Sequence, residues 1–181
     1  MIYKHCPYSF VSKLLWSQTL MADLDPSAQQ RMAAWYRSLR EAGFEGTQTP
    51  GLPYHISLAA FPLAQEKKAA EILRSAAERF PPFPVHISHI GIFAPGKVLF
   101  GAPERNEPLE ALHAFCEPDQ ALQRPWTPHA TLLIDEPERV CAALPVLLRF
   151  FQPLEARITR LHLCAFWPTR EIAAAPLNGN K

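Results

Sequence analysis

Cysteines are few in this sequence, and none stands close to another. The chain of 181 residues has four, with no CxxC pair and no closely spaced set of cysteine and histidine ligands. Such spacing gives no sign of a cysteine-bound metal and favours reduced thiols in a cytosolic protein. We therefore expect a cytoplasmic protein. The four residues are Cys6, Cys116, Cys141 and Cys164.

Long apolar runs are also missing. No stretch approaches the roughly 18 apolar residues that a membrane-spanning helix needs. The N-terminal letters MIYKHCPYSF are interrupted by Lys4, His5 and Pro7, where a signal peptide would need an apolar core. We expect a protein that is soluble, is not exported and does not span a membrane.

Neither sign of charge is in excess. Lysine and arginine number 18, and aspartate and glutamate number 17. The whole molecule therefore has no basic field that would hold long nucleic acid by counterion release. Any contact with nucleic acid should be short or made at a terminus.

Apolar residues and prolines, in contrast, are plentiful. With 48% hydrophobic residues, the chain is long enough to bury one good core, so residues 1–181 are expected to form a single domain. The 19 prolines fall singly or in small clusters between periodic segments, where they separate elements of structure.

Hydrophobic periodicity predicts a mixture of strands and helices. The clearest helix covers 64–80, where alanines and Leu73 form one stripe opposite charged residues. Asp25 and Pro26 are typical of a helix start, and Gly43 of a helix end. Further helices are expected over 107–115 and 137–151, the latter bent at Pro145. Strands are expected over 15–24, 55–61, 80–93, 97–101, 126–134, 156–167 and 171–177.

A short histidine motif occurs three times in the predicted strands. His55-Ile56-Ser57 is repeated letter for letter at His86-Ile87-Ser88, and His129-Ala130-Thr131 is a looser copy. The three copies could be one catalytic pair with an unrelated third member, a three-histidine metal site, or accidents of strand composition.

An internal repeat separates these copies. When the chain is laid on itself with an offset of 74 residues, His55 falls on His129 and Ser57 on Thr131. The apolar faces of strand, helix and strand then coincide for about 40 residues. The second copy has no such counterpart, since His86 falls on Arg160. We expect an α+β fold with two pseudo-symmetric lobes, repeated over about 53–93 and 127–167. Each lobe should be an antiparallel-rich sheet with helices on its outer face, and a cleft should lie between them.

The paired motifs suit proton transfer at a phosphate. Residues i and i+2 of a strand share a face, so each histidine points the same way as its hydroxyl residue. Two imidazoles can accept and donate protons near neutral pH. Two hydroxyls can donate hydrogen bonds to phosphate oxygens. This set predicts opening or hydrolysis of a phosphodiester without a metal or other cofactor.

At these residues the sequence resembles the 2H phosphoesterases, which include 2'-5' RNA ligase-like proteins and 2',3'-cyclic nucleotide phosphodiesterases. The resemblance rests on HISL at 55–58, PHATL at 128–132 and the segment 82–103 between them. It implies that His55 and His129 are the acid–base pair and that Ser57 and Thr131 bind phosphate. The implied substrate is a 2',3'-cyclic phosphate or a 2'-5' linkage in a small nucleotide or at an RNA end.

The sequence departs from many relatives after the second motif. They carry a basic residue there, whereas this chain reads LLID at 132–135. Ligation, or binding of a longer RNA backbone, is therefore not expected unless Arg124 or Arg160 supplies the missing charge.

Other residues are weaker candidates. A metal site of His55, His86 and His129 lacks a carboxylate or cysteine at readable spacing. A module that binds a nucleotide or an RNA end without turnover is the alternative from another class, and a monomer is expected in either case. The candidates for substrate contact are His86, Ser88, Arg160 with its neighbour His162, Trp126 and Tyr54, the last two as surfaces on which a base could stack.

Overall fold

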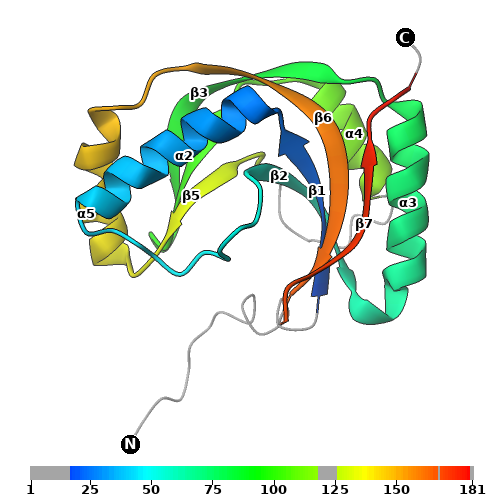
Figure 1. Cartoon of the computed structure of the whole chain (residues 1–181), viewed down its shortest axis with the longest axis horizontal. Coiled ribbons are helices and arrows are strands. Elements are labelled where there is room, and N and C mark those ends of the chain that lie inside the picture. Colours follow the sequence, from blue (N-terminus) through cyan, green and yellow to red (C-terminus); the bar gives the residue numbers. More distant parts are fainter. Residues whose placement is uncertain (1–16, 118–125, 167, 180–181) are drawn as a thin grey trace, which may run out of the picture.

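The secondary structure follows an order that occurs twice along the chain. The structure is a computed structural model and describes residues 17–117, 126–166 and 168–179. Strand, helix, strand, helix, strand is followed by the same sequence of elements and one last strand (Figure 1). The elements are β1 (Ser17–Leu24), α2 (Pro26–Glu41), β2 (His55–Pro62), the short 3-10 helix η1 (Leu63–Gln65), α3 (Glu66–Arg79), β3 (Phe83–Phe93), β4 (Val98–Pro103), α4 (Glu107–Cys116), β5 (Ala130–Ile134), α5 (Pro137–Leu148), β6 (Leu154–Ala165) and β7 (Arg170–Pro176).

One long strand joins the two halves of the sheet. All strand pairs are antiparallel, in the order β2-β1-β6-β3-β4-β5, with β7 also paired to β6. Residues 154–158 of β6 pair with β3, and residues 158–165 pair with β1. The sheet therefore divides into a first lobe of β2, β1, β6 and β7 and a second lobe of β5, β4, β3 and the start of β6.

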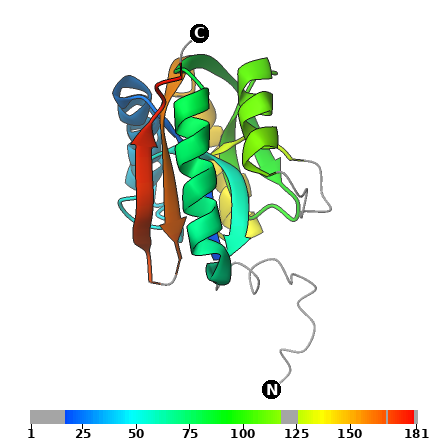
Figure 2. The same cartoon turned by 90° about the vertical axis from the view of Figure 1, so that its right-hand side faces the viewer.

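Helices cover the outer sides of both lobes. α3 and α4 pack on the first lobe, whereas α2 and α5 pack on the second. Figures 1 and 2 show the two helix pairs at opposite ends of the sheet. α2, from the first half of the chain, therefore packs on the lobe that carries His129. α4, from the second half, packs on the lobe that carries His55. The expected α+β fold of two lobes is confirmed.

Local sequence signals explain how the first helices are placed. Asp25 caps α2, because its Oδ1 accepts hydrogen bonds from the backbone N–H groups of Ser27 and Ala28 at 2.9 and 3.2 Å. α3 buries Leu73 and four alanines, and such small side chains let a helix lie close to the sheet. The predicted capping at Asp25 and the predicted stripe of α3 are therefore both confirmed.

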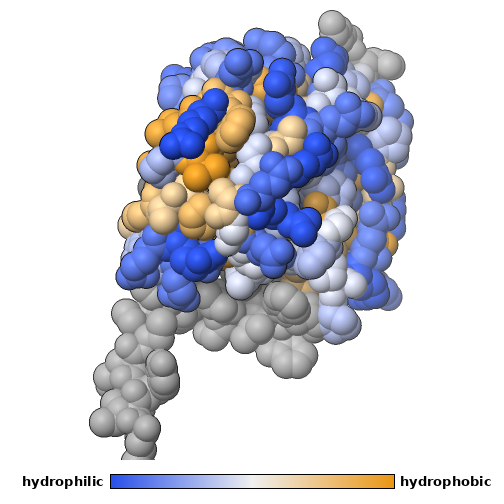
Figure 3. Space-filling model, turned by 60° about the vertical axis from the view of Figure 1, so that its left-hand side comes forward, coloured by the Kyte–Doolittle hydropathy of each residue, from blue (hydrophilic) through white to orange (hydrophobic). Residues whose placement is uncertain are grey.

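Two elements of the second half are shorter than predicted. The strand expected over 126–134 begins at Ala130, because Pro128 has no N–H for a strand ladder. α5 ends at Leu148, which is 59% exposed, and Phe150 after it is 51% exposed. Figure 3 shows apolar side chains among polar ones on this side of the molecule. Ala76 is buried although its counterpart in the 74-residue offset, Phe150, is not. The repeat of 53–93 in 127–167 stays a prediction.

Three of the four cysteines lie in the described part of the chain. Cys116 and Cys164 are buried and Cys141 is exposed, and all three are free thiols. Burial raises the pKa of Cys116 to about 12, which makes it an unreactive core residue. Within the same ranges, no helix is long and apolar enough to cross a lipid bilayer.

Candidate active site

Two histidines are held by the same kind of contact to their own backbone. His55 begins β2, and its Nδ1 lies 2.7 Å from the carbonyl oxygen of Pro53. His129 lies just before β5, and its Nδ1 lies 2.8 Å from the carbonyl oxygen of Thr127. Because a carbonyl only accepts hydrogen bonds, each Nδ1 carries a proton and each Nε2 is left to take up or release one. The two rings are thus in the same tautomer.

Burial keeps both imidazoles neutral at pH 7. It lowers the pKa of His55 to about 4; the hydrogen bond to the backbone and the carboxylate of Asp23 oppose this change, whereas the charges of His162 and His129 add to it. Burial also lowers the pKa of His129, against its own backbone hydrogen bond. Both side chains keep a partly exposed surface, so a substrate can reach them.

The fold brings the two histidine motifs together from different lobes. β2 and β5 are in contact with each other. A charge on His129 would lower the pKa of His55. Trp126, just before the second motif, donates a hydrogen bond from Nε1 to the backbone carbonyl of Ser57 at 3.0 Å. This bond fastens the segment that carries His129 to the strand that carries His55.

The hydroxyls of Ser57 and Thr131 are open to a ligand as far as the described residues show. Ser57 lies opposite Met21 of β1, and Thr131 lies opposite Phe100 of β4. Both are partly exposed, and among the described residues no group hydrogen-bonds to either hydroxyl. Since Ser57 shares a strand face with His55, its hydroxyl is free to donate to a ligand at that ring.

Aromatic rings surround His129. Phe93 meets it at 4.7 Å between centroids and an interplanar angle of 89°, and Phe100 meets it at 5.3 Å. The two phenylalanines pack on each other at 4.3 Å. Room for Phe100 depends on Gly91, because a Cβ there would lie 2.3 Å from the Phe100 ring. The ring of His129 is therefore fixed by apolar contacts.

Charged residues surround His55 instead. Its ring lies 5.9 Å from that of His162, at an angle of 87°. The Nδ1 of His162 is 2.5 Å from Oδ1 of Asp23, and Arg160 approaches the other oxygen of that carboxylate at 3.9 Å. Arg160 also pairs with Glu171 of β7 at 3.3 Å. The two motif histidines are thus alike in tautomer and different in surroundings.

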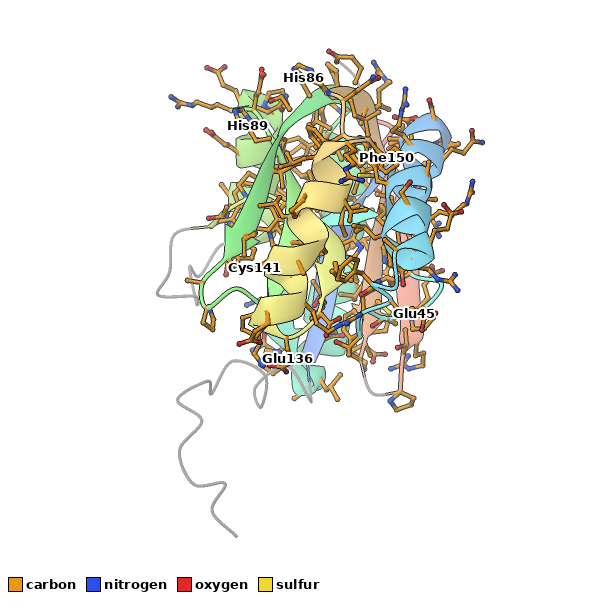
Figure 4. The ribbon with its side chains drawn as sticks, turned by 90° about the vertical axis from the view of Figure 1, so that its left-hand side faces the viewer. Glu45, His86, His89, Glu136, Cys141 and Phe150 are labelled. Carbon is orange, nitrogen blue, oxygen red and sulfur yellow. The ribbon has the colours of Figure 1, made fainter. Side chains whose placement is uncertain are left out.

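The second copy of the motif lies among carboxylates, away from the pair. Nδ1 of His86 is 3.2 Å from Glu104 and its Nε2 is 3.6 Å from Glu155. The hydroxyl of Ser88 is 2.9 Å from Nδ1 of His89. Figure 4 shows His86 and His89 at the same end of the molecule. No contact in the described ranges joins His86 or Ser88 to His55 or His129.

The remaining candidates differ in how open they are. Trp126 stacks on His113 at 3.9 Å, so one ring face is already covered. Tyr54 is partly buried, and burial, helped by the nearby Tyr36, raises its pKa to about 12. Arg160 is exposed and lies beside Asp23, whose strand β1 pairs with the strand that carries His55. Arg124 lies outside the described residues.

The geometry does not assemble the three-histidine metal site. His86 faces Glu104 and Glu155 instead of the other two histidines. Nowhere in the described part do three or more histidine, cysteine, aspartate or glutamate side chains gather so as to hold a metal ion.

Sequence reasoning missed Asp23, Phe93 and Phe100 as neighbours of the two histidines. Asp23 had a visible signal, because it is the only charged residue in the buried strand SQTLMADL. Phe93 and Phe100 had none, since an aromatic residue in a strand is ordinarily core. Their role becomes visible only once β3, β4 and β5 are known to be neighbours.

Solved structures of known proteins share the fold of this chain. LigT of E. coli has a similar fold at 23% sequence identity, with a TM-score of 0.59 over 90% of this chain and 95% of LigT. The protein TT0787 of Thermus thermophilus is 15% identical, with a TM-score of 0.63 over 91% of this chain and 100% of TT0787. Identities this low show a shared fold alone. No curated protein matches the chain significantly in sequence.

The family itself is shown by the sequence. Residues 24–166 match the model of the 2'-5' RNA ligase superfamily, a stretch that contains both histidine motifs and most of the chain. The resemblance to the 2H phosphoesterases is therefore confirmed, and the chain belongs to the 2'-5' RNA ligase superfamily.

Proposed function

We propose that this chain is a metal-independent phosphoesterase that hydrolyses 2',3'-cyclic phosphates or 2'-5' phosphodiesters of small nucleotides or RNA ends. The observation that supports this most is the matched state of His55 and His129: each Nδ1 is bound to a backbone carbonyl, and neither Nε2 has a hydrogen-bond partner among the described residues. Two such rings facing one substrate can supply a base and an acid in the same step.

The reaction needs no group beyond those of the cleft. One imidazole takes a proton at Nε2 from a water molecule, whose oxygen forms a bond to phosphorus. The bond from phosphorus to the leaving ribose oxygen breaks, and Nε2–H of the other imidazole protonates that oxygen. Ser57 and Thr131 donate hydrogen bonds to the non-bridging oxygens, where negative charge builds up. The product is a phosphate monoester when the substrate is a cyclic phosphate.

Known ligands of a similar fold support a small nucleotide as substrate. LigT has been crystallised with ATP and with 3'-AMP. The near balance of 18 basic and 17 acidic residues in this chain also suits a short substrate better than a long one. Because LLID at 132–135 has no basic residue, we propose hydrolysis over ligation. We also propose a cytoplasmic location and a monomeric state.

An assay on 2',3'-cyclic nucleotides and a 2'-5'-linked dinucleotide tests the proposal. Wild type should hydrolyse at least one of these with and without EDTA. His55→Ala and His129→Ala should each lose about 10² to 10⁴-fold in kcat, the usual contribution of an acid or base. His86→Ala is the matched control and should keep wild-type activity, because its contacts are to Glu104 and Glu155.

Three results would contradict the proposal in different ways. Turnover that survives both substitutions removes the acid–base assignment. Loss of turnover in EDTA, restored by a divalent metal, favours metal catalysis. Binding of nucleotides without turnover of any of them identifies the chain as a binding module on the same fold.

A further inference from the structure

A buried pair of polar side chains, Asp23 and His162, lies next to His55 and has no part in the mechanism above. Asp23 and His162 have side chains only 7% and 3% exposed, and Oδ1 and Nδ1 are 2.5 Å apart. Taking such groups out of water costs free energy that an apolar pair would not cost. A stability role alone is therefore a weak explanation for this pair.

The strand register places Asp23 and His162 beside His55. Asp23 of β1 lies directly between His55 of β2 and Arg160 of β6. Two residues earlier in β1, Met21 lies between Ser57 of β2 and His162 of β6. Directly opposed residues share a face, so His162 and Asp23 lie on the face that carries His55 and Ser57. The ring of His162 meets that of His55 at 5.9 Å and 87°.

Nε2 of His162 is buried, and no hydrogen-bond partner for it exists among the described residues. In its charged form, His162 opposes a second positive charge on His55. The two rings meet edge to face at 5.9 Å, so this opposition acts at short range.

We propose that His162, held by Asp23, is a positioning residue that fixes the ring of His55 and, together with burial, keeps that ring ready to accept a proton at Nε2. The proposal rests on the proposed function for its catalytic meaning. Its physical content, the effect of one buried histidine on another, can be measured without turnover.

The other charges around His55 are few and can be named. Asp23 acts on it from β1, His162 from β6 and His129 from the segment before β5, and Arg160 of β6 lies beside Asp23. Glu171 of β7 acts only through Arg160, with which it pairs. Of these groups, Asp23 favours the charged form of His55, whereas His162 and His129 oppose it. Removing His162 leaves the carboxylate of Asp23 facing His55 with less opposition.

His162→Phe separates charge from packing, because phenylalanine keeps an aromatic ring in the strand and loses both nitrogens. NMR titration of the full-length protein, following the ring carbon-bound protons of His55, should show its titration midpoint rising by about one pH unit or more. The acid limb of kcat/KM for a 2',3'-cyclic nucleotide should move to higher pH by the same amount. His86→Phe, a histidine paired with carboxylates outside this cluster, is the control and should leave both unchanged.

A double variant tests the separate effect of Asp23 on the titration of His55. In the double variant Asp23→Asn and His162→Phe, the carboxylate that favours a charged His55 is also gone, so the midpoint should fall back from that of His162→Phe. His162→Gln, which keeps a polar side chain, replaces His162→Phe should the latter not fold. A midpoint for His55 that stays within about 0.3 of wild type in the folded single variants overturns the proposal.

The two proposals fail separately. If wild type turns over no substrate, the proposed function falls, while the titration still decides whether His162 controls His55. If wild type is active and neither the midpoint nor the acid limb moves in the variants, the proposed function stands and the role of His162 falls.

Discussion

At the scale of single residues, the two motif histidines are equivalent in what their backbone does and different in what surrounds them. The carbonyls of Pro53 and Thr127 hold the two Nδ1 atoms at 2.7 and 2.8 Å. Rings of phenylalanine surround His129, and a charged cluster surrounds His55. Residues that look like copies of each other in sequence therefore have separately adjustable proton affinities.

The pH dependence of kcat/KM follows from these two residues. It reports on the free enzyme, which is active when one imidazole is charged and the other neutral. The pKa of His55 is lowered to about 4 and that of His129 is lowered from 6.5. We expect a bell-shaped plot of kcat/KM against pH with its maximum below pH 6.5. Both rings are neutral above pH 6.5, and both are charged below pH 4. Whichever ring is the base, the bell is the same.

Steady-state rates on a 2',3'-cyclic nucleotide from about pH 3.5 to 8, the range that spans both limbs, provide the measurement. The profile of kcat should lie at higher pH than that of kcat/KM, because a bound phosphate anion stabilises a charged imidazole. A kcat/KM maximum above pH 7 would show that burial does not control these rings in solution.

At the scale of elements, the sequence predicted most where a pattern is local and least where it depends on neighbours. The stripe of α3 and the cap at Asp25 are local, and both were found where expected. The choice of His129 over His86 needed the 74-residue offset, and the structure places His86 among carboxylates. The contact between Asp23 and His162 could not be predicted, because it depends on β1 lying between β2 and β6.

A single glycine in β3 decides whether the aromatic wall at His129 can form. Gly91→Ala should displace the Phe100 ring, since the added methyl would lie 2.3 Å from it. We expect a loss of about 1 to 3 kcal/mol in the free energy of unfolding, the usual cost of overpacking, together with a lower kcat. Urea denaturation and the phosphodiesterase assay measure the two effects.

Gly101→Ala is the matched control in the neighbouring strand. Its added methyl would lie 2.9 Å from Cγ2 of Ile87, at the end of a side chain and away from the aromatic rings. It should lose stability and keep the kcat of the folded fraction. Equal losses of kcat in the two variants would mean that the Phe100 ring has no special importance for His129.

At the scale of the whole molecule, the neutral histidines link catalysis to stability. The pKa of His55 is about 4 when folded and near 6.5 in a model peptide, so the unfolded chain binds more protons between these values. Stability should therefore fall as the pH drops from 6.5 to 4. At about 1.4 kcal/mol per pKa unit, His55 accounts for at most about 3.5 kcal/mol of this loss.

Urea unfolding at pH 7 and at pH 4.5 measures this dependence. His55→Gln should unfold with a shallower pH dependence than wild type, because glutamine has no proton to take up. His86→Gln, whose histidine is paired with carboxylates, serves for comparison. If wild type and His55→Gln lose the same free energy of unfolding between the two pH values, acid destabilises the protein through other residues.

The backbone contacts of the two histidines have a consequence for repeated turnover. In each hydrolysis the ring that begins neutral ends charged, and the ring that begins charged ends neutral. The two histidines have therefore exchanged protonation states when the product forms. With each Nδ1 committed to a carbonyl, only the two Nε2 atoms can restore the starting state, through water that enters after the product has left. The cleft must therefore empty and refill with water in every cycle, unless the next substrate binds in the reversed sense and uses the exchanged rings as they stand.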